Sequence, residues 1–175
     1  MDIVFSKIDS PLGAIRIAAR GDLLCGLWFV GQKYDGEPYQ SDTNVRWARA
    51  DDNMFLMQVA TRLAAYFKHP QLSPDLPLVL PGTPFQQIVW RELSNIPGGE
   101  TITYRELAIR IGKPRAIRAA AAAVGRNPVS IIVPCHRVVG SNGSLTGYAG
   151  GIERKESLLK MELAHASLFS PRQPA

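Results

Sequence analysis

Cysteine and histidine are scarce in this chain of 175 residues, which contains two cysteines and three histidines. Cys25 and Cys135 are too few for the disulfide framework of a small secreted domain. Cys25 and His69 would supply only two of the four ligands that a structural zinc site needs. The sequence therefore predicts no disulfide scaffold, no metal site and no cofactor, and Cys25 is expected to be an ordinary core residue.

Long apolar runs are also absent, since no segment approaches the roughly 18 consecutive apolar residues of a membrane span. Residues 1–3 carry an acid where a signal peptide would carry basic residues. We therefore expect a protein of the reducing cytoplasm with no membrane partner. The length and a hydrophobic content of 46% allow one folded domain or two small ones.

Acidic residues are sparse in the second half of the chain. Residues 1–80 contain 8 basic and 9 acidic residues, whereas residues 81–175 contain 12 basic and 6 acidic ones. Within 105–126 the only acid is Glu106, and six basic residues surround it: Arg105, Arg110, Lys113, Arg115, Arg118 and Arg126. Such a basic segment is typical of proteins that bind a phosphate backbone, although a solvated helix face is a commoner meaning of clustered charge.

The first 80 residues predict a small α/β supporting domain. Apolar-rich segments at 3–8, 14–19 and 23–30 are separated by turn residues at 9–13 and 21–22, which indicates three strands. The polar stretch 31–51 is expected to be a loop. Residues 53–68 show the periodicity of an amphipathic helix, with Phe55, Val59, Leu63 and Phe67 on one face.

A proline-rich stretch at 69–84 predicts a linker to a second domain over 81–170, with a disordered tail at 171–175. Residues 85–94 should form a helix. Thr103 and Glu106 fit a capping box that opens a helix to about 111. After a turn at 112–114, where Pro114 suits a first helical position, a second helix is expected over 115–124. Together these elements predict a helix-turn-helix at about 103–124.

Six alanines leave the second of these helices nearly bare, with Arg118 as its main long side chain. A bare helix can approach a groove closely and bind DNA by shape, with little sequence preference. The alternative is a close helix–helix contact inside the protein, which must hold for some of the alanines. Weak sequence preference suits a repair protein better than a repressor.

Pro134-Cys135-His136-Arg137 places a cysteine beside a histidine, just after the apolar run 131–133. An imidazole or a nearby cation favours the thiolate, which is the nucleophilic form of cysteine. The apolar run predicts a strand that delivers Cys135 to the edge of a site. The alternative is a small buried hydrophobic residue, which is what most lone cysteines are.

The order of motifs over residues 84–162 resembles that of the O6-alkylguanine-DNA alkyltransferases, the methylated-DNA–protein-cysteine methyltransferases. The motifs are Pro84-Phe85-Gln86, Val89-Trp90, Ile96-Pro97-Gly98, Thr103-Tyr104, Leu107-Ala108, Ile111-Gly112-Lys113-Pro114, Arg118-Ala119, Gly125-Arg126-Asn127-Pro128, Pro134-Cys135-His136-Arg137-Val138 and Gly147-Tyr148, with Ser10-Pro11-Leu12-Gly13 as a weaker one. The resemblance implies an α/β (α+β) fold. A small N-terminal antiparallel-sheet-plus-helix domain would precede a mainly helical C-terminal domain. It is to the stand-alone bacterial type, which lacks a four-cysteine regulatory domain.

The resemblance also implies the chemistry. Cys135 would take the alkyl group from guanine O6, and possible action on thymine O4 stays open. His136 would accept the thiol proton through a water, and Glu162 would polarise that histidine. Tyr104 would assist base rotation and protonate guanine N3, while Asn127 would brace the active-site loop. Without the resemblance, the residues alone favour Glu162 as a surface carboxylate of a helix and Asn127 as a turn residue.

Six further residues are implied to contact DNA or the extruded base. Arg118 would fill the space that the flipped nucleotide leaves, and the base pocket would use the Val138 carbonyl with the backbone of Tyr148 and Ala149. Position 149 is often serine in relatives, so any side-chain help there is lost. The remaining DNA contacts are assigned to Arg115 and Ala119, besides Tyr104.

The implied partner is double-stranded DNA that carries O6-alkylguanine. The protein is expected to bind it as a monomer, and cooperative binding along the DNA is left open. One rival is a non-catalytic alkylated-DNA-binding protein, but such proteins replace the acceptor cysteine, and Cys135 is intact. A second rival is a thiol hydrolase, which would leave the DNA-binding half without a purpose.

Overall fold

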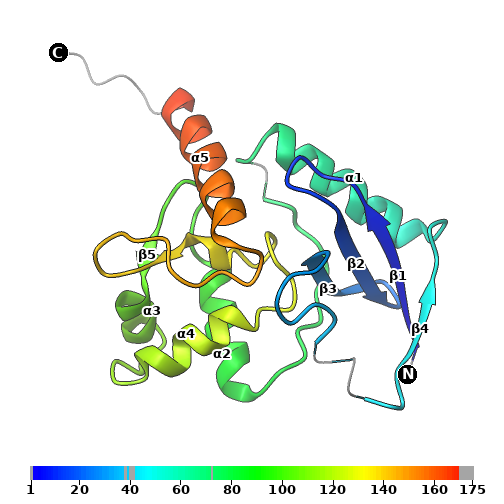
Figure 1. Ribbon diagram of the computed structural model, residues 1–175, viewed down its shortest axis with the longest axis horizontal. Coiled ribbons are helices and arrows are strands. Elements are labelled where there is room, and N and C mark those ends of the chain that lie inside the picture. The colour runs from blue at the N-terminus through cyan, green and yellow to red at the C-terminus, as the bar shows by residue number, and fades with distance from the viewer. Residues whose placement is uncertain (1, 38, 40–41, 72, 170–175) are drawn as a thin grey trace.

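The computed structural model describes residues 2–37, 39, 42–71 and 73–169 (Figure 1). Four strands form the N-terminal sheet in the order β3-β2-β1-β4. They are β1 (Asp2–Ile8), β2 (Ile15–Arg20), β3 (Leu23–Phe29) and β4 (Arg46–Arg49). The first three pair antiparallel as the sequence predicts, whereas β4 pairs parallel with β1.

β4 lies inside the stretch 31–51, so the prediction of an uninterrupted loop there is wrong. Its four residues, Arg-Trp-Ala-Arg, alternate weakly, and no residue of the strand is fully buried. Edge strands need only one partner, and β4 is held by its ladder to β1 rather than by a hydrophobic pattern of its own.

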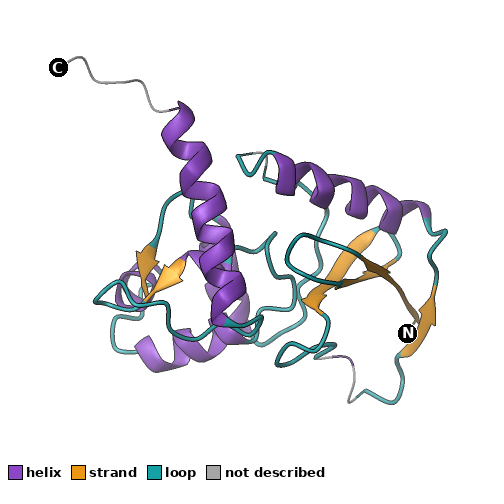
Figure 2. Ribbon diagram, turned by 45° about the horizontal axis from the view of Figure 1, so that its top comes forward, coloured by secondary structure: helices purple, strands orange, loops and turns teal. Residues whose placement is uncertain are grey.

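Helix α1 (Met54–Lys68) covers one face of the sheet (Figure 2). Asn53 caps it by accepting a hydrogen bond from the Leu56 backbone N–H at 3.0 Å. Phe55, Val59 and Leu63 are buried on its inner side as predicted. The opposite face of the sheet carries a second apolar cluster that includes Cys25, which is therefore confirmed as a core residue.

The predicted linker is tied to the edge of the sheet by backbone hydrogen bonds. Leu24 N–H donates to the Pro77 carbonyl at 2.9 Å, and Val79 N–H donates to the Leu24 carbonyl at 3.0 Å. Further along the same strand, Leu27 exchanges two 2.9 Å bonds with Pro128 and Ser130. Segments from the middle and the C-terminal half thus cover the β3 edge, and one hydrophobic core runs through both halves.

The C-terminal half is mainly helical, so the expected α+β class is confirmed. Its elements are α2 (Pro84–Ser94), β5 (Ile102–Thr103), α3 (Tyr104–Arg110), α4 (Ile117–Gly125), β6 (Val138–Val139) and α5 (Ile152–Phe169). The capping box of Thr103 and Glu106 is present at the start of α3. Figure 1 shows α5 standing between this half and the sheet.

Helices α3 and α4 form the predicted helix-turn-helix with one local difference. α4 begins at Ile117 after the N-cap residue Ala116, so Pro114 belongs to the turn and does not occupy a first helical position. Lys113 N–H bonds the Ala108 carbonyl at 2.8 Å, and Ala116 N–H bonds the Lys113 carbonyl at 2.8 Å. These turn bonds delay the start of the helix.

The alanines of α4 divide between packing inside the protein and exposure to solvent. Ala120 and Ala123 are buried, and the Trp90 indole N–H of α2 donates to the Ala123 carbonyl at 2.8 Å. Ala119 and Ala122 are exposed on the other side of the helix. The small side chains let α4 pack closely on α2, and on the exposed side they leave a helix surface without bulky side chains.

Residues 130–133 form a turn, so the predicted strand before Cys135 is wrong. Ile131 has a φ of 71°, and Val133 N–H bonds back to the Val129 carbonyl at 3.0 Å. The run is buried on all sides, and periodicity does not distinguish a buried turn from a buried strand.

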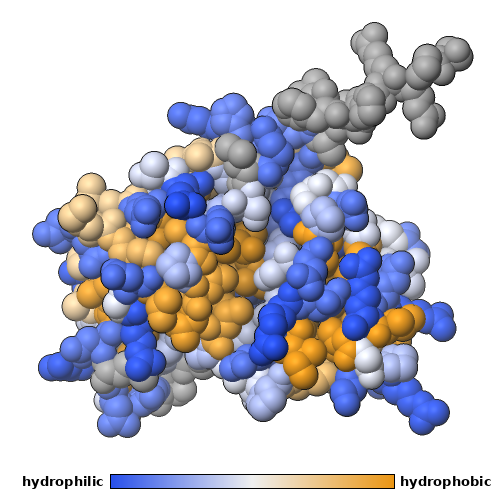
Figure 3. Space-filling model, turned by 180° about the vertical axis from the view of Figure 1, so that it is seen from behind, coloured by the Kyte–Doolittle hydropathy of each residue, from blue (hydrophilic) through white to orange (hydrophobic). Residues whose placement is uncertain are grey.

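From behind, an apolar patch lies over the N-terminal half, while hydrophilic residues dominate the C-terminal half (Figure 3). The predicted tail 171–175 lies outside the described residues. No helix in the described part of the chain is both long and apolar enough to cross a membrane.

Candidate active site

Cys135, His136 and Arg137 form a buried 3₁₀ turn between the 130–133 turn and β6. Two backbone bonds shape it, from Cys135 N–H to the Val133 carbonyl at 2.8 Å and from Arg137 N–H to the Pro134 carbonyl at 3.0 Å. Cys135 is only 4% exposed. The turn therefore places the thiol just beneath the surface and buries the side chains of Cys135, His136 and Arg137 inside the protein.

Asn127 braces this turn from the end of α4. Its Nδ2 donates to the Val133 carbonyl at 2.7 Å and to Cys135 Sγ at 3.1 Å, while its Oδ1 accepts from the Val129 backbone N–H at 3.0 Å. The amide thus uses both ends, and one of its donors is aimed at the sulfur. A donor in this position stabilises a negative charge on Sγ.

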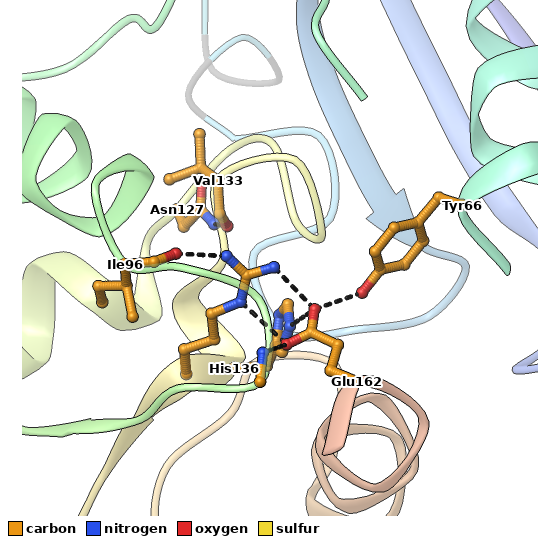
Figure 4. A network of polar contacts seen from close by, with 8 residues as sticks. Tyr66, Ile96, Asn127, Val133, His136 and Glu162 are labelled. Atoms are coloured by element: carbon orange, nitrogen blue, oxygen red, sulfur yellow. Dashed lines mark hydrogen bonds and ion pairs between the residues drawn. The ribbon is translucent and has the colours of Figure 1, made fainter. Parts of the chain in front are cut away.

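Glu162 of α5 is the centre of a buried polar network (Figure 4). Its Oε1 accepts from His136 Nε2 at 3.0 Å, from Arg137 Nη2 at 2.8 Å and from the Tyr66 hydroxyl at 2.7 Å. Its Oε2 accepts from Arg137 Nε at 2.9 Å and from the Gly99 N–H at 3.4 Å. The carboxylate has all its partners inside the protein, so it is not the surface group that a helix position alone would suggest.

These contacts set the protonation states of the network. Burial opposes the charge on Glu162, but hydrogen bonds and charges from His136 and Arg137 hold its pKa well below its ordinary value. Burial lowers the pKa of His136 despite the neighbouring carboxylate, so the ring is neutral at neutral pH. Since Nε2 must donate to the ionised Glu162, Nδ1 carries the lone pair, and it has no partner among the described residues. Nδ1 is therefore the atom that can accept a proton.

The thiol itself is protonated in the free protein. Burial raises the pKa of Cys135 above its ordinary value, and the opposing influences of Asn127 and Lys155 are smaller. The expectation that neighbouring groups favour the thiolate at rest is therefore wrong for this state, because desolvation outweighs them. The geometry points instead to a thiol that loses its proton only when the reaction begins.

Lys155 is a buried cation next to this site that the sequence did not single out. Its Nζ donates to the Val138 carbonyl at 2.6 Å and to the Thr146 carbonyl at 3.0 Å. Burial lowers its pKa to about 8, and a negative charge on Cys135 acts in the opposite direction. The Val138 carbonyl assigned to the base pocket is thus already bound, and the lysine fixes the loop that leads to residue 146.

An open pocket of about 610 Å³ lies between α4 and the 146–149 loop. It is lined by Lys33, Tyr34, Tyr104, Ile117, Arg118, Ala121, Ala122, Gly125, Arg126, Thr146, Gly147, Tyr148 and Ala149. The predicted residues Tyr104, Arg118, Tyr148 and Ala149 therefore meet around one cavity. Cys135 and Val138 do not line it, and neither do Arg115 and Ala119, which are exposed elsewhere on the helix-turn-helix.

Tyr104 joins α3 to this pocket. Its hydroxyl donates to the Thr146 carbonyl at 3.0 Å and lies 3.2 Å from the Gly147 carbonyl. Burial raises the pKa of Tyr104 to about 12, and a charge on Cys135 adds to the increase. The phenol therefore stays protonated at neutral pH and keeps a proton that it can donate. In the described part of the chain, no three His, Cys, Asp or Glu side chains lie together as a metal site would need.

Two family models match consecutive parts of the sequence. Residues 3–80 match the ribonuclease-like domain of 6-O-methylguanine DNA methyltransferase, and residues 84–164 match its DNA-binding domain. The chain belongs to the 6-O-methylguanine DNA methyltransferase family. The resemblance that the motifs indicate is confirmed.

Curated members of the family are similar over nearly their whole length. A methylated-DNA–protein-cysteine methyltransferase of Methanosarcina barkeri is 46% identical over 158 residues, which cover 90% of this chain and 96% of that protein. One from Mycobacterium tuberculosis is 45% identical over 164 residues, covering 94% of each.

Solved structures of the methyltransferase family share the fold. The crystal structure of Mycobacterium tuberculosis O6-methylguanine methyltransferase is 42% identical, with a TM-score of 0.81 over 96% of this chain and 99% of that one. The Mycobacterium tuberculosis protein OGT in complex with DNA is 39% identical, with a TM-score of 0.75 over 97% of this chain and all of that one.

Two partners of the Glu162 carboxylate, Arg137 and Tyr66, were not predicted from the sequence. The signal for Arg137 was its place in an apolar stretch, because a buried arginine needs a counter-ion, but the sequence did not indicate that Glu162 is that counter-ion. The only signal for Tyr66 was its position near the apolar face of α1, and that position is equally typical of an aromatic residue that packs in the core.

Proposed function

We propose that this chain repairs double-stranded DNA by direct reversal, moving an alkyl group from guanine O6 to Sγ of its own Cys135. One observation carries the assignment of residues. A buried thiol contacts Asn127, and its neighbour His136 has a free Nδ1 and an Nε2 bound to Glu162. Membership of the methyltransferase family supports the reaction type, and the basic helix-turn-helix supports duplex DNA as the partner.

Transfer requires the damaged base to leave the duplex, because O6 is inaccessible inside the stack. The base would enter the pocket beside α4, with Arg118 on its rim to occupy the vacated position in the helix. Cys135 lies outside the pocket lining, so the base would have to pass toward it along Tyr104 and Tyr148, the lining residues that interact electrostatically with the thiol. The Ala149 backbone and Tyr148 lie on the opposite wall. A bare α4 lets the groove approach closely enough for this exchange.

The chemical step is a single displacement. The thiol proton passes to Nδ1 of His136 through a water, and Sγ attacks the alkyl carbon. A C–S bond forms as the C–O6 bond breaks, and the guanine takes a proton from the Tyr104 hydroxyl. Asn127 and Lys155 stabilise the transient thiolate. The products are S-alkylcysteine and an intact guanine, with no cofactor consumed.

Both cysteines are free thiols in the structure. We place the protein in the cytoplasm, where a reducing environment keeps Cys135 in this form. A non-catalytic alkylated-DNA-binding protein is the alternative function. The intact thiol and its polar partners weigh against it, since binding alone needs neither.

Repair should stop after one lesion per chain. A thioether has no good leaving group, and no residue near Cys135 is able to remove the alkyl group. With a tenfold excess of duplex carrying O6-methylguanine, the amount of restored guanine should equal the amount of protein, with or without a chelator. Continued turnover, or loss of repair in the chelator, would contradict the proposal.

Arg118→Ala should slow repair of duplex much more than repair of the free O6-methylguanine base, because the free base needs no flipping. Arg115→Ala is the matched control, since Arg115 is an exposed arginine of the same helix-turn-helix that does not line the pocket. Its loss should weaken binding and reduce the salt slope by about one unit, and saturating protein should restore the rate.

Single-turnover repair at saturating protein separates the two roles. The Arg118→Ala chain should remain slow while Arg115→Ala recovers. Full recovery of Arg118→Ala would show that Arg118 is only another phosphate contact.

A further inference from the structure

Tyr66 brings the N-terminal half of the chain into contact with the reaction centre. It lies on α1, 96 positions before Glu162, and its hydroxyl donates to Glu162 Oε1 at 2.7 Å. Only 1% of Tyr66 is exposed, and its ring packs edge-on against Phe67 at 5.6 Å between centroids. Figure 4 shows the hydroxyl approaching the carboxylate from the side opposite Ile96.

The direction of this hydrogen bond is fixed. Burial raises the pKa of Tyr66 well above its ordinary value, and the charge on Glu162 raises it further. The phenol is thus always protonated, and Glu162 is always the acceptor. Because Tyr66 and His136 share the oxygen Oε1, the tyrosine competes directly for the electron density that His136 Nε2 binds.

Other charged or titratable groups face the same pair. Arg137 from the 3₁₀ turn interacts with both Glu162 and His136, and Lys155 from α5 interacts with His136. Tyr148 from the 146–149 loop interacts with Cys135 and Tyr66. Arg137 and Lys155 both lower the pKa of His136, whereas Glu162 raises it. Among the described residues, Tyr66 is the only one that donates to the Glu162 carboxylate through a neutral hydroxyl group.

We infer that Tyr66 is a positioning residue for alkyl transfer, through which the N-terminal half sets the orientation and charge of Glu162 and thereby the basicity of His136. The inference rests on the proposed function. When Tyr66 donates to Oε1, it disperses the negative charge of the carboxylate and weakens its pull on His136. His136 then stays neutral, with Nδ1 ready to accept the thiol proton.

Loss of the hydroxyl has a defined consequence. In Tyr66→Phe the carboxylate keeps more charge, so it stabilises the imidazolium and raises the pKa of His136. The neutral, proton-accepting form is then reached only at higher pH. A hydroxyl that merely tied α1 to α5 would lower stability on removal but would leave the pH dependence of transfer in place.

The test is the pH profile of single-turnover transfer from saturating methylated duplex. In Tyr66→Phe the ascending limb should move to higher pH by about one unit, the size expected for one hydrogen bond to a buried charge. At a pH below the wild-type limb, transfer should therefore slow about tenfold, while the rate well above both limbs should match the wild type. DNA binding should be unchanged. Tyr39→Phe is the matched control, because it removes another buried hydroxyl of the same half, one that contacts Cys25, and its profile should match the wild type.

A double-mutant cycle tests whether the shift in the pH profile depends on the Glu162 carboxylate. In a Glu162→Gln background, which already lacks the carboxylate charge, adding Tyr66→Phe should shift the profile no further. An equal shift in both backgrounds would overturn the inference, and so would an unshifted limb in Tyr66→Phe alone.

A second variant keeps the inference testable if Tyr66→Phe does not fold. Difluorotyrosine placed at position 66 keeps the shape of the ring and makes the hydroxyl a stronger donor, so the limb should move to lower pH. An unmoved limb would refute the positioning role. Failure of the proposed function looks different, since the wild-type chain would then transfer no alkyl group at any pH.

Discussion

Cys135→Ser should abolish alkyl transfer while leaving DNA binding essentially unchanged. A hydroxyl is a far weaker nucleophile than a thiol in this setting, since its deprotonation costs much more in the same buried site. The change is small in volume, and Asn127 Nδ2 can donate to the new oxygen as it does to Sγ. The helix-turn-helix and the pocket rim, which we propose hold the DNA, are not touched by the substitution, since Cys135 does not line the pocket.

Single-turnover repair and duplex binding measured on the same preparation check this prediction. Cys25→Ala is the control, because Cys25 is the other free cysteine and lies fully buried in the cluster on the outer face of the sheet. It should retain transfer. A Cys135→Ser chain that still restores guanine would place the chemistry elsewhere.

Arg137→Ala should lower the free energy of unfolding by about 3–5 kcal/mol, the usual cost of breaking a buried ion pair on one side. The guanidinium bonds both oxygens of Glu162, at 2.9 Å and 2.8 Å, and both side chains are almost fully buried. Without it the carboxylate keeps the hydrogen bonds from His136, Tyr66 and Gly99 but loses its permanent counter-ion.

Urea unfolding at neutral pH measures this loss. Arg46→Ala provides the comparison, because the Arg46–Asp2 pair has similar geometry but is exposed to solvent, and its removal should produce no measurable change. If the two variants lost the same stability, burial of the Arg137–Glu162 pair would not be the source of its effect.

Local signals were enough for most elements of the fold. The turn between β1 and β2 and the Thr103–Glu106 capping box each depend on a few adjacent residues, and both are present as predicted. Apart from the start of α4, which is displaced by bonds within its own turn, the failures lie where partners come from far away. β4 exists because β1 offers an edge, and the 130–133 turn exists because Val129 pairs with Leu27 of β3.

The residues of the site also fall into those that local motifs indicate and those that only the packing reveals. The motif around Cys135 and the resemblance that it carries led to His136, Glu162 and Asn127, and the structure brings all three together with the cysteine or its neighbour. The partners that complete the site, Tyr66 and Lys155, come from helices whose packing the sequence does not specify.

The protonation of Cys135 could not be read from the sequence. A histidine next to a cysteine indicates an activated thiol, but the pKa depends on burial, which only the fold determines. Here burial keeps the thiol neutral until it reacts. That state also makes the free protein less open to unwanted oxidation, because the thiolate is the reactive form.

The most direct test of alkyl transfer to Cys135 is the mass of the protein after incubation with excess duplex carrying O6-methylguanine. Intact-mass analysis followed by peptide mapping should show one added methylene per chain, confined to the peptide that contains Cys135. An unchanged mass alongside tight binding would indicate the non-catalytic alternative. An added methylene on the Cys25 peptide, or more than one per chain, would contradict the assignment of Cys135 as the single acceptor.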